Sequence, residues 1–176
     1  MKKAASIFLR AQLEPVDVRR LSGWMRNRHV TQYLNEDAHA SDKLEQLLET
    51  TPPPMLTCRF NQQGRFFLIC DEREDSIGFI RLREQPGPGC CEIVFAIGEE
   101  SLWGNGYGVQ AVRAAQYYAF LERRAQKLTA NIYHGNLRSV KTVCRCGFRE
   151  EERLEKLSRY SITMNEYLNF LNKKRA

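Results

Sequence analysis

Trp103-Gly104-Asn105-Gly106-Tyr107-Gly108 is the stretch of the sequence that decides the fold. It follows an apolar run that ends at Ile97 and precedes an amphipathic run that starts near Gly108. Glycine lets backbone N–H groups approach a ligand closely and permits positive φ angles. The N-terminus of a helix adds unpaired donors and a partial positive charge, which suit a pyrophosphate. We therefore favour a phosphate-binding loop over its alternative, a bare turn between a strand and a helix.

A dinucleotide site is the main rival, because residues 106–111 satisfy the pattern G-x-G-x-x-A. That motif requires a carboxylate about 20 residues further on to hold a ribose. No Asp or Glu occurs between Arg123 and Arg149, and the glycines follow several expected antiparallel strands. A P-loop is excluded as well, since no Lys-Ser or Lys-Thr pair follows the glycines.

The residues before the loop predict four strands and two helices. Pro15 suits the first turn of a helix, and Val18, Leu21 and Met25 mark its buried stripe. The expected strands are residues 6–12, 65–70, 76–83 and 90–97, and the second helix is residues 41–49. The short connections between the later strands favour antiparallel pairing.

After the loop, the pattern alternates between helix and strand. Asn136 is a good N-cap for a helix that turns Leu137, Val140 and Cys144 inward and stops at Gly147. The other expected elements are a helix at 108–124, strands at 127–133, 148–156 and 158–164, and a terminal helix or tail from residue 165. The fold class is α+β: a mixed, mostly antiparallel twisted sheet flanked by helices, with a central β-α-β passage that contains the glycine loop.

Length and composition predict a single domain over residues 1–176. Hydrophobic residues make up 43% and charged residues 27%, which is ordinary for a globular protein. The formal charge is +6, but the basic residues are dispersed, so nucleic acid is not expected as a partner. No apolar run approaches the roughly 20 residues that span a bilayer, so no membrane partner is expected. We expect a cytoplasmic monomer or homodimer.

The six cysteines lack the spacing of a zinc site. They offer an adjacent pair and one Cys-x-Cys, and the three histidines are scattered. Several of the cysteines lie in apolar patterns, where a thiol behaves as a small hydrophobic group. The sequence therefore predicts reduced packing cysteines and no metal.

The order and spacing of five segments resemble the GNAT acetyltransferases, specifically the RimJ/RimL-like branch. The similarity covers nearly the whole chain, and its central segment is the glycine loop, which resembles the family's W-G-x-G-Y-G motif. The other segments are Phe8-Leu9-Arg10, residues 24–34, Asn136-Leu137-Arg138-Ser139 with Cys146-Gly147-Phe148, and residues 160–167.

This resemblance implies an enzyme that transfers acetyl from acetyl-coenzyme A directly to a primary amine, on a small molecule or a protein N-terminus, in a ternary complex. It implies that strand residues pair their backbone with the pantetheine arm and that loop amides hold the pyrophosphate. Asn136 would bond the arm, and Ser139 would lie near the sulfur. The implied coenzyme residues are Phe95, Ala96, Ile97, Trp103, Gly104, Asn105, Gly106, Tyr107, Gly108, Val109, Asn136 and Ser139.

Glu92 is the candidate general base. It lies on the strand beside Val94 and Ala96, and apolar neighbours would raise its pKa. The alternative is a structural Glu bonded to an arginine. The family often has a Tyr acid at the position of Val143, so Ser139, a water or no acid would serve the leaving thiolate here.

Acceptor selection is less specified. The resemblance places Trp24, Asn27 and Tyr33 on the acceptor wall, and Tyr133 could line the site from the next strand. Core packing explains Trp24 and Tyr133 as well. Binding of a polyamine would require an acidic lining, and Asn35-Glu36-Asp37 supplies a little negative charge. The alternative function is a catalytically weak acyl-coenzyme A-binding regulatory module. A third function, an RNA-binding accessory protein, is supported only by the net charge.

Overall fold

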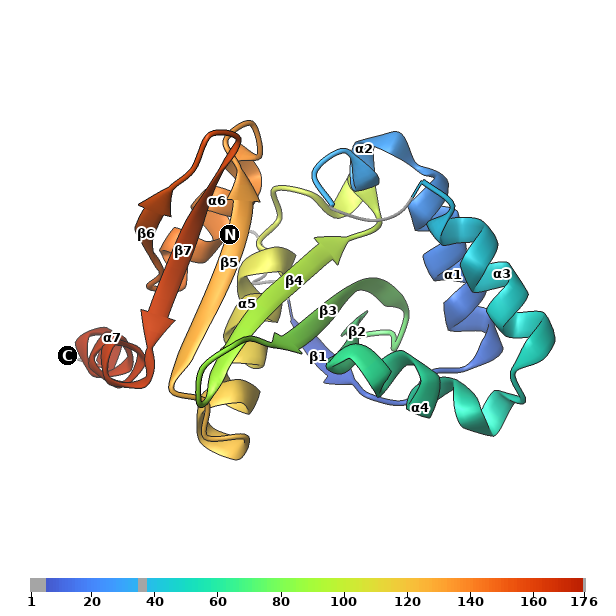
Figure 1. The fold of residues 1–176 in the computed structure, drawn as a ribbon, viewed down its shortest axis with the longest axis horizontal. Coiled ribbons are helices and arrows are strands. Elements are labelled where there is room, and N and C mark those ends of the chain that lie inside the picture. Colours follow the sequence, from blue (N-terminus) through green and yellow to red (C-terminus); the bar gives the residue numbers. More distant parts are fainter. Residues whose placement is uncertain (1–5, 35–37, 176) are drawn as a thin grey trace.

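The fold is a seven-stranded sheet with helices on both faces (Figure 1). The computed structural model describes residues 6–34 and 38–175. The strand order is β1-β2-β3-β4-β5-β7-β6, and every neighbouring pair is antiparallel except β4 and β5. The strands are β1 (Ile7–Arg10), β2 (Arg65–Asp71), β3 (Ser76–Glu84), β4 (Cys90–Ile97), β5 (Lys127–Tyr133), β6 (Arg149–Arg153) and β7 (Leu157–Thr163).

The helices include all those expected from the sequence and two short additions, α2 and α4. The α-helices are α1 (Pro15–Arg26), α2 (Arg28–Thr31), α3 (Ala40–Thr50), α4 (Leu56–Phe60), α5 (Tyr107–Tyr117), α6 (Leu137–Arg145) and α7 (Met164–Arg175). Short 3₁₀ turns are η1 (Pro53–Met55), η2 (Asn61–Gln63) and η3 (Glu100–Leu102), and α5 continues as the π-helical turn η4 (Tyr118–Glu122). The predicted fold class is confirmed, with small shifts at the ends of elements.

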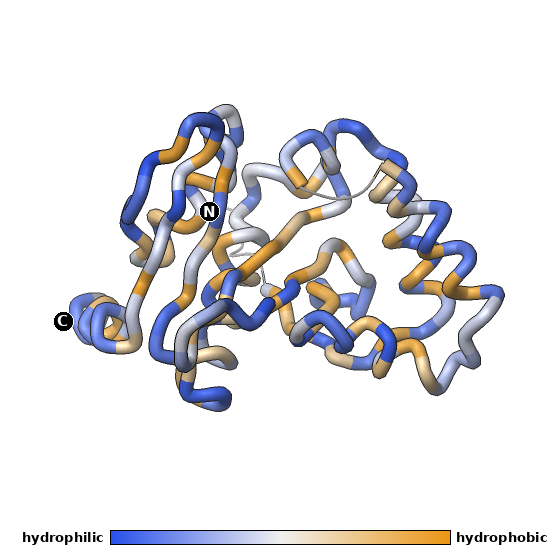
Figure 2. Tube along the Cα trace, viewed as in Figure 1, coloured by the Kyte–Doolittle hydropathy of each residue, from blue (hydrophilic) through white to orange (hydrophobic). Residues whose placement is uncertain are grey.

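Two hydrophobic clusters cover the two faces of the sheet. One lies under α5, α6 and α7 and includes Ala111, Val112 and Val143. The other lies under α1, α3 and α4, over β2 and β3, and includes Leu21 and Phe66. Figure 2 shows a mostly apolar β4 and apolar residues alternating with polar ones along α1 and α3. Residues alternate between the two clusters along a strand because their side chains point to opposite faces.

The pairing of β4 with β5 ends before the middle of both strands. The two strands pair only at Cys90↔Lys127, Cys91↔Leu128 and Glu92↔Thr129. Beyond Glu92, β4 keeps its pairing with β3 on one side, as far as Gly78↔Ile97, but has no strand on the other. Figure 1 shows β4 and β5 diverging toward the end where α2 and the start of α6 lie. The sheet therefore opens into a V at this end.

The predicted inward face of α6 is wrong. Leu137 is 62% exposed and Cys144 is also exposed, whereas Val143 is fully buried beside the partly buried Val140. On a helix of 3.6 residues per turn, Val140 and Val143 lie opposite a basic face formed by Arg138, Lys141 and Arg145. Leu137 and Cys144 lie at the border between the two faces and turn toward solvent.

The cysteines divide into three pairs by burial. All six are free; Cys70 and Cys146 are buried, and Cys58 and Cys144 are exposed. The packing interpretation therefore holds for Cys70 and Cys146 and for the partly buried Cys91, which packs against the hydrophobic core; Cys90 is also partly buried. In the described residues no group of three or more His, Cys, Asp or Glu side chains is placed to hold a metal ion. No helix there has the length and apolarity that crossing a membrane requires.

The outer strand β6 is unusual in composition. All five of its residues are charged and exposed, with the sequence REEER (Figure 2). It pairs with β7 on one side only, and Arg159 of β7 forms an ion pair with Glu152 at 2.9 Å. β6 is thus a polar edge with little apolar surface to bury.

Gly98, directly after β4, makes close packing of α1 on the sheet possible. A Cβ atom at this position would lie 2.1 Å from Cδ2 of the buried Trp24 ring. We expect Gly98→Ala to lower the free energy of unfolding by about 1–3 kcal/mol, because overpacking forces side chains and backbone to move. Urea unfolding followed by circular dichroism measures this.

Gly23→Ala is the matched control, since Gly23 lies within α1 and a Cβ atom added there would meet no atom within 4 Å. It should raise stability by about 0.5–1 kcal/mol, the usual gain of Ala over Gly in a helix. Equal effects at the two glycines would contradict the proposed packing constraint.

Candidate active site

A cavity of about 410 Å³ lies at the open end of the V, between β4, the glycine loop, α2 and α6. Every residue expected to bind the coenzyme lines it, except Asn105. The side-chain amide of Asn105 is exposed and donates to the Ser101 carbonyl oxygen at 3.4 Å. The residues brought together as expected are Phe95, Ala96, Ile97, Trp103, Gly104, Gly106, Tyr107, Gly108, Val109, Asn136 and Ser139.

The glycine loop needs glycine for its backbone conformation. Gly104 has φ +77° and Gly106, the N-cap of α5, has φ +91°. No atom lies within 4 Å of a Cβ position at either residue, so crowding by neighbouring protein atoms is not the reason. The first backbone bond of α5 is donated by Gln110 to Gly106 O at 3.2 Å. The N–H groups of residues 106–109 come before this bond and have no acceptor within the helix, and all four residues line the cavity.

Three basic residues of α6 that the sequence reasoning missed also line this cavity. Arg138, Lys141 and Arg145 follow the spacing i, i+3, i+7, which places them on one helix face. No Asp or Glu occurs among the described lining residues. The cavity therefore combines helix-terminal donors with three cations, a suitable environment for several phosphate groups. The i, i+3, i+7 spacing is the signal in the sequence that would have found them.

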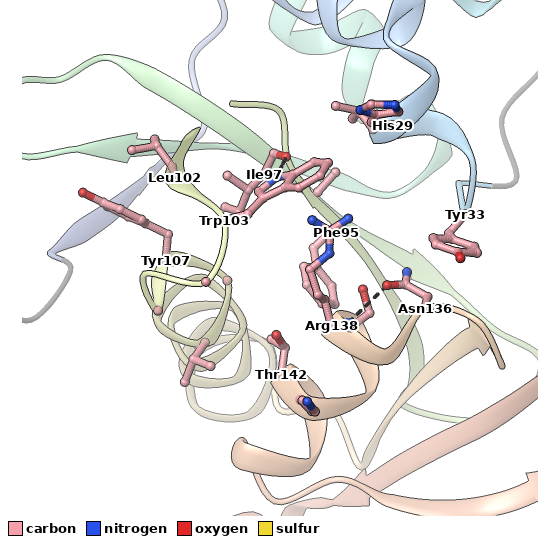
Figure 3. Close-up of a pocket in the computed structure, with 18 of the residues that line it drawn as sticks. His29, Tyr33, Phe95, Ile97, Leu102, Trp103, Tyr107, Asn136, Arg138 and Thr142 are labelled. Atoms are coloured by element: carbon pink, nitrogen blue, oxygen red, sulfur yellow. Dashed lines mark hydrogen bonds between the residues drawn. The ribbon is translucent and has the colours of Figure 1, made fainter. Parts of the chain in front are cut away.

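Trp103 connects the loop to both neighbouring elements. Its indole N–H donates to Ile97 O at the end of β4, with Nε1 and O 2.7 Å apart. The Arg138 guanidinium carbon lies 3.5 Å from the centroid of the Trp103 rings, a cation–π contact (Figure 3). The loop is therefore held to β4 by a hydrogen bond and to α6 by a stacked cation.

The free edge of β4 offers backbone groups to the cavity. Gly98 N–H donates to Ile77 O on β3, at 2.8 Å, so Ile97 directs its backbone groups to the opposite side. By the same alternation, Phe95 directs its N–H and C=O toward the gap that β5 has left. An extended chain placed in the gap could pair with these groups as a strand would.

Asn136 is the N-cap of α6, as predicted. Its side-chain oxygen accepts from Ser139 N–H at 3.2 Å (Figure 3). This use leaves its side-chain NH₂ as the group that can donate to a ligand. Asn136 and Ser139 also line a second cavity, of about 370 Å³, on the other side of the gap. The two cavities share Tyr33, Leu34 and Phe95 as well, so they meet at the open edge of β4.

Glu92 lies in this second cavity, in polar surroundings rather than the expected apolar ones. Its Oε1 accepts from Asn131 Nδ2 at 2.8 Å and its Oε2 accepts from Gln85 Nε2 at 3.3 Å. Arg83 and Arg159 also line the cavity, and Arg83 stands opposite Glu92 in the β3–β4 register. Two amide donors thus orient the carboxylate, which is half-buried.

Of the four expected acceptor residues, the structure brings Tyr33 and Tyr133 together and leaves two elsewhere. The two tyrosine rings lie 6.5 Å apart between centroids and both line the second cavity. Trp24 lines neither cavity; it is 6% exposed and its indole N–H donates to Glu99 Oε1 at 3.0 Å. Asn27 lines neither cavity; it caps α2 by accepting from His29 N–H at 2.9 Å. Residues 35–37 lie outside the described residues.

The α2 region is tied to the start of the glycine loop through Glu100. Asn27 Nδ2 donates to Glu100 Oε1 at 2.6 Å, and His29 Nδ1 lies 3.0 Å from Glu100 Oε2. These hydrogen bonds lower the pKa of Glu100, with Asn27 the larger contributor. His29 itself lines the first cavity. Glu100 therefore links the wall of the cavity at His29 to the segment just before the glycine loop.

Comparison with known proteins gives the family. Residues 7–149 match the sequence profile of the Acetyltransferase (GNAT) domain, which covers most of the chain. The chain belongs to the GNAT acetyltransferase family. No curated protein sequence gives a significant match to this GNAT chain.

Solved structures share the same fold. A spermidine N-acetyltransferase from Vibrio cholerae in complex with CoA and spermine is 24% identical with a TM-score of 0.77, covering 93% of this chain and 98% of that one. An aminoglycoside acetyltransferase in complex with coenzyme A is 17% identical with a TM-score of 0.75, with the same coverage. A GNAT-family acetyltransferase from Bacillus anthracis is 18% identical with a TM-score of 0.73, again over 93% and 98%.

GNAT enzymes use acetyl-coenzyme A as the acetyl donor, and the first cavity fits that molecule chemically. Coenzyme A carries a pyrophosphate and a further phosphate, which match the loop N–H groups and the cations of α6. Its pantetheine arm is an extended chain with two amides, which match the open backbone groups of Phe95. The cosubstrate of this GNAT enzyme is therefore acetyl-coenzyme A.

Gly106 provides a test of the loop. Gly106→Val should weaken coenzyme A binding by about 100-fold or more, because a β-branched residue disfavours positive φ and projects a side chain at the ligand. Isothermal titration with coenzyme A measures the affinity, and circular dichroism checks the fold. Gly106→Asn separates the effect of the backbone angle from the effect of the added side chain. Asn tolerates the left-handed region, so this variant tests the side chain alone. A folded Val variant with unchanged affinity would place the phosphate site elsewhere.

Proposed function

We propose that this GNAT protein is a RimJ/RimL-like N-acetyltransferase that acetylates a primary amine of a small molecule or a protein N-terminus. The observation that supports this most is that two cavities meet at the unpaired edge of β4. One cavity is basic and suits the coenzyme; the other contains an oriented carboxylate. Such an arrangement favours direct transfer in a ternary complex, with the donor entering from one side and the acceptor from the other. We include in the proposal a single domain over residues 1–176 and a cytoplasmic monomer or homodimer.

On the donor side, the backbone of the residues from Phe95 to Ile97 would pair with the pantetheine arm. The N–H groups of the loop and of the first turn of α5 would hold the pyrophosphate. The Asn136 side-chain NH₂ would donate to the arm, since its oxygen already caps α6. Asn105 would contribute through its backbone only. Arg138, Lys141 and Arg145 would neutralise the phosphate charges.

On the acceptor side, Glu92 would remove a proton from the ammonium form of the acceptor. The free amine then forms a bond to the acetyl carbon, the carbon–sulfur bond breaks, and the sulfur takes up a proton. Ser139 lines both cavities and is the candidate to donate that proton or bond the arm. Val143 is fully buried in the core and lines neither cavity, so no side-chain acid is available at that position.

The charges of the cavities favour an acceptor with a single amine over a polyamine. Glu92 is the one acidic residue among the described residues that line either cavity, and Arg83 and Arg159 accompany it. A polyamine would need several carboxylates to replace the water around its charges. Tyr33 and Tyr133 offer aromatic surface to an apolar or aromatic body.

A kinetic panel tests the proposal. We expect a singly charged aromatic amine or a short peptide with a free N-terminus to be acetylated with a kcat/KM at least tenfold above that of spermidine. Release of free thiol and mass spectrometry of the product measure turnover. Spermidine as the best substrate would overturn the assignment of the acceptor and leave acetyl transfer standing.

The alternative function is a catalytically weak acyl-coenzyme A-binding regulatory module, which the buried valine at position 143 favours. Coenzyme binding without turnover of any amine in the panel would support it.

Glu92→Gln tests the base. The substitution keeps the shape and an acceptor oxygen for Asn131 but removes the carboxylate, so kcat should fall about 10²–10⁴-fold. Coenzyme affinity should not change, because Glu92 does not line the first cavity. Glu84→Gln, at the exposed end of β3, is the matched control and should keep full activity. A loss below about threefold at every pH would make Glu92 structural.

A further inference from the structure

A third cavity, of about 510 Å³, lies away from the site described above. It is an open pocket, bordered by α1, α3, α4 and η2 on one side and by β2 and β3 on the other. It shares no lining residue with the two cavities of the candidate active site. Its volume falls in the usual range of small-molecule sites, about 300–1,000 Å³. Nothing in the acetyl-transfer chemistry uses it.

The floor of this cavity is aromatic. Phe66 and Phe79 stack with ring centroids 5.7 Å apart, and Phe60 meets Phe66 at 4.9 Å with a tilt of 60°. All three are buried, and aliphatic side chains of α1 and α3 complete the apolar lining. A flat ring placed here would find the offset or tilted aromatic partners that such rings prefer.

The rim of the same cavity is cationic. Lys43 of α3, Arg59 of α4 and Arg81 of β3 line it from three separate elements, and Gln62 and Gln63 add amide donors. No Asp or Glu occurs among the described residues that line it. The charged side chains among these described residues are therefore all cations, which suit an anionic ligand.

Arg81 is the residue that connects the floor with the rim. It is half-buried, and its guanidinium carbon lies 5.3 Å from the centroid of the Phe66 ring. A planar guanidinium stacked on a ring can still make an in-plane, two-pronged contact with a carboxylate. Anion recognition and ring recognition therefore occur next to each other.

We propose that this cavity binds a small aromatic carboxylate, with the ring against Phe66 and Phe79 and the carboxylate at Arg81 and Lys43. The proposal is independent of the acetyl acceptor and of the coenzyme, because it concerns different residues. A polyamine does not fit, since its charges would face three cations. Coenzyme A fits the first cavity better, where helix-terminal N–H groups supplement the cations.

The probe is 3-phenylpropionate, and its neutral isostere 3-phenylpropanamide is the ligand control. We expect saturable binding of the carboxylate by isothermal titration with Kd below about 1 mM, as for a compact ligand of this size. The amide should bind at least tenfold more weakly, because it lacks the charge that strengthens bonds to guanidinium. Equal binding of both, or no saturable binding of the carboxylate, would overturn the proposal.

Arg81→Gln should weaken binding of the carboxylate about tenfold or more, with acetyltransferase activity kept. Arg65→Gln is the matched control: the Arg65 guanidinium carbon also lies 5.3 Å from a ring centroid, that of Phe67, but Arg65 does not line the cavity. Equal effects of the two substitutions would contradict the site. Lys43→Gln, at an exposed position of α3, should weaken binding about threefold or more and covers the case in which Arg81→Gln fails to fold.

Competition decides the location. Saturating acetyl-coenzyme A should change the Kd of 3-phenylpropionate by less than twofold, because the two ligands occupy separate cavities. If acetyl-coenzyme A abolishes binding of the carboxylate, the carboxylate occupies the coenzyme cavity and the proposal falls.

Discussion

The early end of the β4–β5 ladder is the constraint on which the rest of the structure depends. After Glu92↔Thr129 the two parallel strands separate, and a single sheet keeps its order on both sides of the gap. Unpaired backbone inside a protein is costly unless something pairs with it. The separation therefore leaves backbone groups of β4 with which a bound ligand can pair. The N-termini of α5 and α6 both lie beside the gap. Fold and site are thus consequences of the same break in hydrogen bonding.

The contacts around Trp103 show how a glycine-rich loop can have a single defined conformation. Two of its residues adopt left-handed backbone angles, which glycine adopts without steric cost. The indole bond to Ile97 and the stacked Arg138 fix its position between β4 and α6. A donor site built in this way is organised before the ligand arrives, so less binding free energy is lost in ordering the loop.

The sequence predicted the strands, the longer helices, the N-cap Asn136 and the loop, because these depend on local periodicity, capping residues and glycines. It did not predict which face of α6 is buried, since Val140 belongs to both possible stripes and only the packing on α5 decides between them. The interpretation of Trp24 needed knowledge of Gly98, which is distant in the chain and in contact in space. The gap beside β4 is a property of strand pairing, which no single segment encodes. The roles of Glu92 and Ser139 remain predictions.

The fully charged strand β6 has a consequence for how the protein behaves at high concentration. A sheet edge normally offers a row of open N–H and C=O groups to any other extended chain. On β6 every added strand would have to bring its side chains against five charges and gain little apolar burial. The opposite edge, β1, is only four residues long. Sheets of neighbouring molecules therefore have little reason to join edge to edge, and the chain can carry an open sheet in a crowded solution without polymerising through it.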